Sequence, residues 1–194
     1  MPLAFAVGNE PHSDHTAVVT AVAADYVSMA TFVSCLPDWL PVPVAIVASG
    51  NAAQPGVVQA LANEALMPVV ALDRPRHLEP GICYVGLAAR APVIGDGFAY
   101  PSGHVARDAG TTGFLRSAAL TYGARTLAVF LEGSLPLADG FARRLGWAGV
   151  RVFARAPDDH VLVRTGVVRN YHSTEILCEA VGIASAHRLS LLAV

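Results

Sequence analysis

The stretch FLRSAALTYGARTLAVFLEG, residues 114–133, decides the fold. Its first half favours a helix that turns at Gly123, and its second half is an apolar run over residues 126–131 that ends before Glu132. Glycine commonly follows the last turn of a helix. A continuous apolar run bounded by turn residues is typical of a strand buried on both faces. The stretch therefore predicts a helix that leads directly into a buried strand.

The same alternation of helix and strand recurs along the chain. Continuous apolar strands separated by helices predict a doubly wound, mostly parallel sheet with helices on both faces, a Rossmann-like three-layer α/β sandwich. A chain of 194 residues without repeats or linkers predicts one domain, residues 1–194. Strands are predicted over residues 3–7, 42–48, 68–72, 82–85, 126–131, 150–154 and 189–194, helices over residues 15–35, 54–67, 111–122, 137–147 and 174–181, and a Gly/Pro-rich loop over residues 95–110.

The composition excludes several classes of protein. With 54% hydrophobic and 14% charged residues the chain is too apolar to be disordered, and a net charge of −2 gives no reason to expect a nucleic-acid partner. The longest apolar window, residues 16–33, is interrupted by Asp25 and by threonine and serine, so no membrane span is predicted. Three scattered cysteines without a CxxC pair and the lack of a signal peptide predict a reduced, cytoplasmic protein.

Three segments resemble the methylesterase domain of the chemotaxis protein-glutamate methylesterase family. They are FLRSAALTYGAR at residues 114–125, LEPGICYVG at residues 78–86, and the run from LPD to PVPVAIV at residues 36–47. The likeness extends over residues 4 to 155 and implies a hydrolase fold with a serine, a histidine and an aspartate in its site. At this length we expect no N-terminal receiver domain of the kind that members of this family commonly carry.

The chain departs from the family's sequence pattern at the position of the catalytic nucleophile. In the family a Gly-x-Ser-Thr-Gly-Gly turn follows the first strand, and here the corresponding turn reads Gly8, Asn9, Glu10, Pro11 and His12, with Glu10 in the place of the serine. A carboxylate cannot replace an attacking hydroxyl, and proline lacks an amide proton for an oxyanion.

The other two catalytic positions also differ or are displaced. The family histidine ends the second strand, where this chain has Ser49 followed by Gly50 and Asn51. A serine hydroxyl has too high a pKa to act as a general base near neutral pH. Asp139, which precedes a glycine, supplies the acid that the resemblance implies. An acid without its base and nucleophile is not a triad.

Two functions follow. The first is a degenerate member of the family that acts as a regulatory or binding protein in signalling, with a chemoreceptor-like or other signalling protein as partner and with no metal or cofactor. The second is a rearranged ester or amide hydrolase that uses Ser13 or Ser49, Asp139, and His12, His15 or His104. The cleft is predicted to be formed by Gly8, Asn9, Glu10, Gly50, Asn51, Arg116, Glu132 and Gly133.

The predicted first helix is apolar nearly all round, whereas a helix that packs on a sheet needs an apolar stripe of only about 100°. Either a further layer of the chain or a second subunit must cover the surplus, and we expect a homodimer through this helix. Ser13 or Asp14 is predicted to cap it. Residues 158–160 are interpreted as an exposed loop, and Arg116 either lies at the edge of the active site or stabilises its helix.

Overall fold

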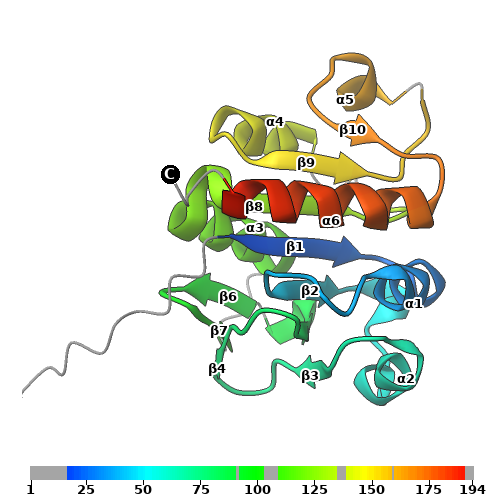
Figure 1. The fold of residues 1–194 in the computed structure, drawn as a ribbon, viewed down its shortest axis with the longest axis vertical. Coiled ribbons are helices and arrows are strands. Elements are labelled where there is room, and N and C mark those ends of the chain that lie inside the picture. The colour runs from blue at the N-terminus through cyan, green and yellow to red at the C-terminus, as the bar shows by residue number, and fades with distance from the viewer. Residues whose placement is uncertain (1–16, 91, 103–108, 135–138, 159, 191–194) are drawn as a thin grey trace, which may run out of the picture.

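A computed structural model of the chain describes residues 17–90, 92–102, 109–134, 139–158 and 160–190 (Figure 1). Its main sheet has seven strands in the order β10-β9-β8-β1-β2-β5-β3, and every neighbouring pair is parallel. This confirms the predicted parallel α/β sheet. The strands are β1 (Val18–Ala23), β2 (Val44–Ala48), β3 (Val69–Ala71), β5 (Cys83–Leu87), β8 (Thr126–Phe130), β9 (Arg151–Ala154) and β10 (Arg169–Asn170).

Helices cover both faces of this sheet and give the predicted three layers. One face packs against α1 (Tyr26–Cys35), α2 (Val57–Glu64) and α6 (Thr174–Ser190), and the other packs against α3 (Ala109–Tyr122) and α4 (Asp139–Trp147). In β1, Val19 and Ala21 face the first layer, whereas Val18 and Val22 face the second. The central strand is therefore apolar on both sides because both sides are buried. Short helices complete the chain: α5 (Val161–Arg164), η1 (Gly50–Ala52), η2 (Ala88–Arg90) and η3 (Gly123–Arg125).

The predicted first helix is wrong in its N-terminal part. Residues 18–23 form β1, the central strand of the sheet, and α1 begins only at Tyr26. Alanine and β-branched residues in a fully buried run suit a central strand as well as a helix, and the tertiary context decided between them. The cap is Asp25, and the predicted caps and the predicted strand over residues 3–7 lie outside the described residues. Most of the surplus apolar surface that suggested a dimer belongs to the core, although Val27 of α1 is 70% exposed.

The predicted loop over residues 95–110 contains part of a second sheet. β4 (Arg76–His77), β7 (Phe98–Pro101) and β6 (Pro92–Gly95) form a small antiparallel sheet, in which Asp96 and Gly97, with φ of 48° and 81°, make the turn between β6 and β7. An Asp-Gly pair favours such a two-residue hairpin turn because both positions need a positive φ.

Hydrogen bonds of the Ser117 side chain connect this hairpin to α3. Its hydroxyl accepts a hydrogen bond from the Ile94 amide at 2.9 Å and donates one to the Phe114 carbonyl at 2.7 Å. Thr121, one helical turn further on, donates to the Ile94 carbonyl. The side chain of Ser117 is therefore part of the packing between α3 and the small sheet.

The C-terminal part of the chain also differs from the prediction. The helix predicted over residues 174–181 extends to Ser190, so the first residues of the strand predicted over 189–194 are helical, and residues 191–194 lie outside the described residues. Within the described residues, no helix has the length and apolar character needed to cross a membrane.

Candidate functional site

The strand order places a crevice at the carboxyl ends of the central strands. The chain runs outward from β1 through β2 to one edge, then returns to the other side of β1 with β8, β9 and β10. In open parallel sheets, ligands bind outside the carboxyl ends of the strands near such a reversal. The segments there follow β1, β2, β8, β9 and β10.

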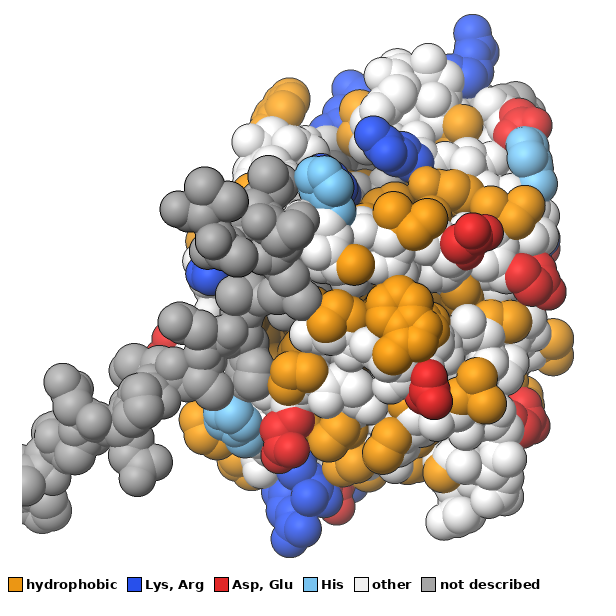
Figure 2. All heavy atoms as spheres, viewed as in Figure 1, with side chains coloured by type: hydrophobic (Ala, Val, Ile, Leu, Met, Phe, Trp, Pro, Cys, Tyr) orange, Lys and Arg blue, Asp and Glu red, His pale blue; other side chains and the backbone are white. Residues whose placement is uncertain are grey.

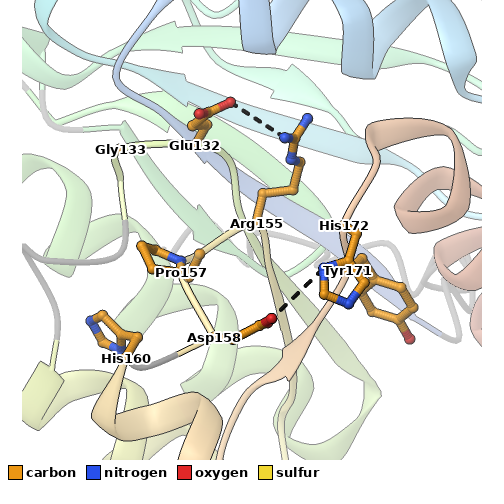
Figure 3. A pocket seen from close by; sticks show the side chains of 9 residues that line it. Glu132, Gly133, Arg155, Pro157, Asp158, His160, Tyr171 and His172 are labelled. Atoms are coloured by element: carbon orange, nitrogen blue, oxygen red, sulfur yellow. Dashed lines mark ion pairs between the residues drawn. The ribbon is translucent and has the colours of Figure 1, made fainter.

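A cleft of about 620 Å³ opens at the ends of β8, β9 and β10 (Figure 3). Three separate segments line it, one after each of these strands, so the sheet itself fixes their spacing. The lining residues are Glu132, Gly133, Arg155, Ala156, Pro157, Asp158, His160, Tyr171 and His172. This volume is within the range of small-molecule sites.

Arg155 lines the cleft at the carboxyl end of β9. It follows the last residue of β9, and its amide donates to the Phe130 carbonyl, which continues the pairing with β8. Its guanidinium lies 3.7 Å from the Glu132 carboxylate and donates to the Thr174 hydroxyl at 3.2 Å, as Figure 3 shows for the pair with Glu132. The side chain of Arg155 is about one-third exposed, so it is held in position and still faces solvent.

Hydrogen bonds of Asn170 join the end of β10 to the segment that follows β9, which includes Asp158. The Asn170 side chain pairs with both the amide and the carbonyl of Ala156 and donates to the Asp158 carboxylate at 2.8 Å. His172 lies 4.0 Å from the same carboxylate (Figure 3). Both side chains of this second pair are mostly exposed, so the pair contributes little to stability.

His160 stands at the mouth of the cleft, on the far side of Asp158 from His172 (Figure 3). It is the N-cap of α5, and its Nδ1 accepts a hydrogen bond from the Leu162 amide at 3.3 Å. An accepting Nδ1 leaves the proton of the neutral ring on Nε2. The cleft thus combines an arginine and two histidines with two carboxylates, a set that favours a small polar ligand.

In the turn after β1, the carboxylate of Asp25 caps the first turn of α1. One Asp25 oxygen accepts from the Val27 amide at 2.8 Å and the other accepts from the Ser28 amide at 3.1 Å. These amides are the free donors at the start of α1, the groups that could otherwise hold an anion. Here the protein's own side chain occupies them.

Replacing Asp25 with alanine is expected to lower the free energy of unfolding by about 1 kcal/mol near pH 7, because α1 loses its cap. Hydrogen bonds from the Ser28 hydroxyl, then from the amides of Ser28 and Val27, hold the pKa of Asp25 below its ordinary value of 3.8 despite some opposing burial. The carboxylate therefore stabilises the fold above that value, and the effect is lost as the pH falls through the folded-state pKa.

Urea unfolding of both proteins from neutral to acidic pH measures this effect. The difference between wild type and Asp25→Ala should persist at neutral pH and shrink below 3.8. Asp25→Asn, which keeps an acceptor without the charge, serves as the matched control. A difference that is as large at acidic pH as at neutral pH would contradict this assignment.

Ser49 follows the last residue of β2 and contacts the end of β1. Its hydroxyl donates to the Ala23 carbonyl at 3.1 Å, and its amide donates to the same atom. Gly50 follows with a φ of 53°, and a Cβ on it would lie 2.9 Å from the Ala24 carbonyl oxygen. This close approach requires glycine. Gly50 and Asn51 form an exposed turn at the carboxyl end of β2, where the cleft was predicted.

The structure brings only part of the predicted site together. Glu132 and Gly133 line the cleft, whereas Arg116 lines a separate hollow between α3 and α4. Asp139 is the first residue of α4, and its side chain is outside the described set. The remaining candidates lie outside the described residues and stay predictions; they are Gly8, Asn9, Glu10, His12, Ser13, His15 and His104.

The sequence reasoning missed the part of the cleft beyond β9. Asp158 and His160 were interpreted as an exposed loop, yet together with Arg155 and His172 they form most of its polar lining. The available signal was their position, since all four lie in the segments that come after β9 or β10. Polar residues at the carboxyl ends of parallel strands gather at one edge of the sheet.

Comparison of the sequence with protein-family models and with curated proteins gives no match. Among solved structures, the fold is similar to the CheB methylesterase catalytic domain of Thermotoga maritima, with a TM-score of 0.64 and 18% sequence identity. The match covers 87% of this chain and 97% of that one. The chain therefore has a CheB methylesterase-like fold, over a larger part than the three segments that suggested it.

Proposed function

We propose that this chain is a binding or regulatory protein built on the methylesterase fold and that it does not hydrolyse glutamyl esters. The observation that carries the proposal is the Asp25 carboxylate on the first amides of α1. The sequence resemblance placed the nucleophile in the turn over residues 8–12, after a strand predicted over residues 3–7. We place it instead in the turn after β1, because β1 is the central strand and the first strand of the sheet among the described residues.

A carboxylate in this turn opposes hydrolysis in two ways. It cannot attack as a serine does, and it occupies amides that could stabilise the negative charge of a tetrahedral intermediate. A substrate oxyanion would also meet a fixed negative charge there. Loss of such donors removes the largest electrostatic contribution to acyl transfer.

The serine hydroxyls support the same conclusion. A serine nucleophile gives its proton to an imidazole. Among the described residues, five serine hydroxyls donate to backbone carbonyls instead, and Ser49 at the histidine position of the family is one of them. The five are Ser34, Ser49, Ser117, Ser134 and Ser185.

Binding is assigned to the cleft between Glu132 and His172. Its arginine, two histidines and two carboxylates provide donors and acceptors for a small polar molecule. In a signalling system, a ligand held there would bias the association of this protein with a chemoreceptor-like or other signalling partner.

The direct test is labelling with a serine-directed fluorophosphonate, read by intact-protein mass spectrometry. We expect no more label on the folded chain than on the urea-denatured chain, and no methanol release from a glutamyl methyl ester peptide. An active serine hydrolase serves as the positive control. Rapid labelling of the folded chain that Ser13→Ala or Ser49→Ala abolishes would refute the proposal in favour of the rearranged hydrolase.

A further inference from the structure

A hollow of about 300 Å³ lies between α3 and α4, on the face of the sheet opposite α6. Each helix contributes one side of it, and an alanine on each side leaves open the space that a larger side chain would fill. The volume is at the lower end of small-molecule sites, which span about 300–1,000 Å³, so the hollow fits one or two side chains of a partner. Its walls include Arg116, Ala119 and Leu120 on one side and Phe141, Arg144 and Ala148 on the other.

Arg116 and Arg144 bring one positive charge from each helix to this hollow. Both are exposed, and neither forms an ion pair with a carboxylate among the described residues. The described residues that line the hollow include no carboxylate. An arginine stays charged in proteins and has five N–H donors. The two guanidinium groups therefore favour an anionic partner at this place.

Apolar side chains at the same hollow favour a protein as that partner. Leu120 lines it and is 77% exposed, although the outer side of a surface helix is normally polar. Phe141 also lines it and is partly buried against the core layer. Trp147, one helical turn after Arg144, is 84% exposed. Tryptophan and arginine are enriched in protein interfaces, where they contribute disproportionately to affinity.

The charge of the molecule is divided unevenly between its two helical layers. The sequences of α3, η3 and α4 contain four arginines and one aspartate, whereas those of α1, α2 and α6 contain three glutamates and one arginine besides His187. Figure 2 views the molecule from the side of α6 and shows carboxylates spread over that layer. The layer that contains the hollow is therefore positive, although the net charge of the chain is −2.

A second copy of this chain does not complement the hollow. A two-fold axis brings the same patch of both copies together, and here it would place arginines against arginines. Like charges that face each other across an interface disfavour association. The occupant that complements this surface carries carboxylates and comes from another protein.

We propose that the hollow between α3 and α4 docks an acidic amphipathic helix of a partner protein. Apolar side chains of that helix enter the hollow beside Leu120 and Phe141. Carboxylates on either side of its apolar stripe pair with Arg116 and Arg144. A groove between two helices accepts the side-chain ridge of a third. The site uses no residue of the cleft at the end of β8, β9 and β10, so it does not depend on the proposed function.

The first test is the binding of two designed helical peptides to the full chain, measured by fluorescence anisotropy at low and high salt. Both peptides have about 20 residues and the same stripe of leucines, and their other positions are glutamate in one and lysine in the other. We expect the glutamate peptide to bind about tenfold more tightly or better, with an affinity that falls as salt screens the arginines. Equal affinity for the two peptides, or no binding of either, would overturn the proposal.

Charge reversal tests whether the peptide binds at this hollow. Arg116→Glu combined with Arg144→Glu should weaken binding of the glutamate peptide about tenfold or more, and the charge-reversed protein should bind the lysine peptide instead. Arg74→Glu is the matched control, because Arg74 is exposed in the turn between β3 and β4. Thermal melting by circular dichroism verifies that the variants fold. An equal loss in both proteins, or a charge-reversed protein that does not gain the lysine peptide, would contradict the assignment.

The apolar contribution has its own test. Leu120→Ser should weaken binding of the glutamate peptide about fivefold, whereas Leu66→Ser, at a leucine that is 68% exposed between α2 and β3, should leave it unchanged. Vesicles of phosphatidylglycerol distinguish a lipid surface from a protein partner. Vesicle binding that the two arginine substitutions abolish, without binding of the glutamate peptide, would refute the proposal in favour of a membrane.

Discussion

Replacing Gly110 with alanine is expected to lower the free energy of unfolding by about 3 kcal/mol, which is a large part of the stability of a domain of this size. Gly110 is buried in the first turn of α3, where the helix passes over η2. A Cβ at this position would overlap the Ala88 carbonyl oxygen and lie 3.0 Å from its carbon. Both are backbone atoms, so the whole first turn of α3 or η2 must move.

Gly113 provides the matched control in the same helix. A Cβ there would meet nothing within 4 Å. Gly113→Ala should therefore stabilise the protein by about 0.5–1 kcal/mol, since alanine is the better helix former. Equilibrium denaturation in urea compares the two variants. Equal effects of the two substitutions would show that the close approach of α3 to η2 is not a constraint.

Replacing Phe130 with alanine should cost about 4 kcal/mol of unfolding free energy. Phe130 is fully buried at the end of β8, in the core layer that contains Phe114 and Leu145. Its carbonyl also accepts from the Arg155 amide at the base of the cleft. The substitution therefore leaves a cavity directly beneath the segments that form the candidate site.

Phe98→Ala is the control for this prediction. Phe98 is 44% exposed in β7 and contacts the ring of His77 edge-on at 5.1 Å. The same chemical change should cost only about 1 kcal/mol there, because the transfer and cavity contributions are smaller. Thermal and urea unfolding measure both variants. A loss at Phe130 no greater than that at Phe98 would contradict the assignment of the core.

Much of the fold could be predicted from apolar runs and their turns. The strands over β2, β8 and β9 and the helix α3 were found within a few residues, because each lies between clear turn signals. β1 was not found. Its residues are apolar without alternation, since both faces of a central parallel strand are buried, and such a run has no period that separates it from a buried helix. The Asp96–Gly97 pair is a turn signal in the sequence that would have predicted the hairpin of β6 and β7.

The candidate site could be predicted only in part. Glu132 and Gly133 were found because they follow a well-defined strand, whereas Arg155 and His172 depend on where β9 and β10 sit in the sheet. Strand order is not encoded in any local pattern. The role of Asp25 was hidden for the same reason, since a cap is recognisable only when the start of its helix is known.

The order of strands in the sheet also determines how the polypeptide can be assembled during translation. Val18 pairs with Thr126 on one side and its neighbour Val19 pairs with Val44 on the other, so the edge of β1 that pairs with β8 lacks this partner until β8 has left the ribosome. β5 must likewise insert between β2 and β3, which precede it. Pairings between strands that are far apart in the sequence slow folding, and until they form, unpaired strand edges are exposed to association with other nascent chains. We expect this protein to need chaperone protection through most of its synthesis.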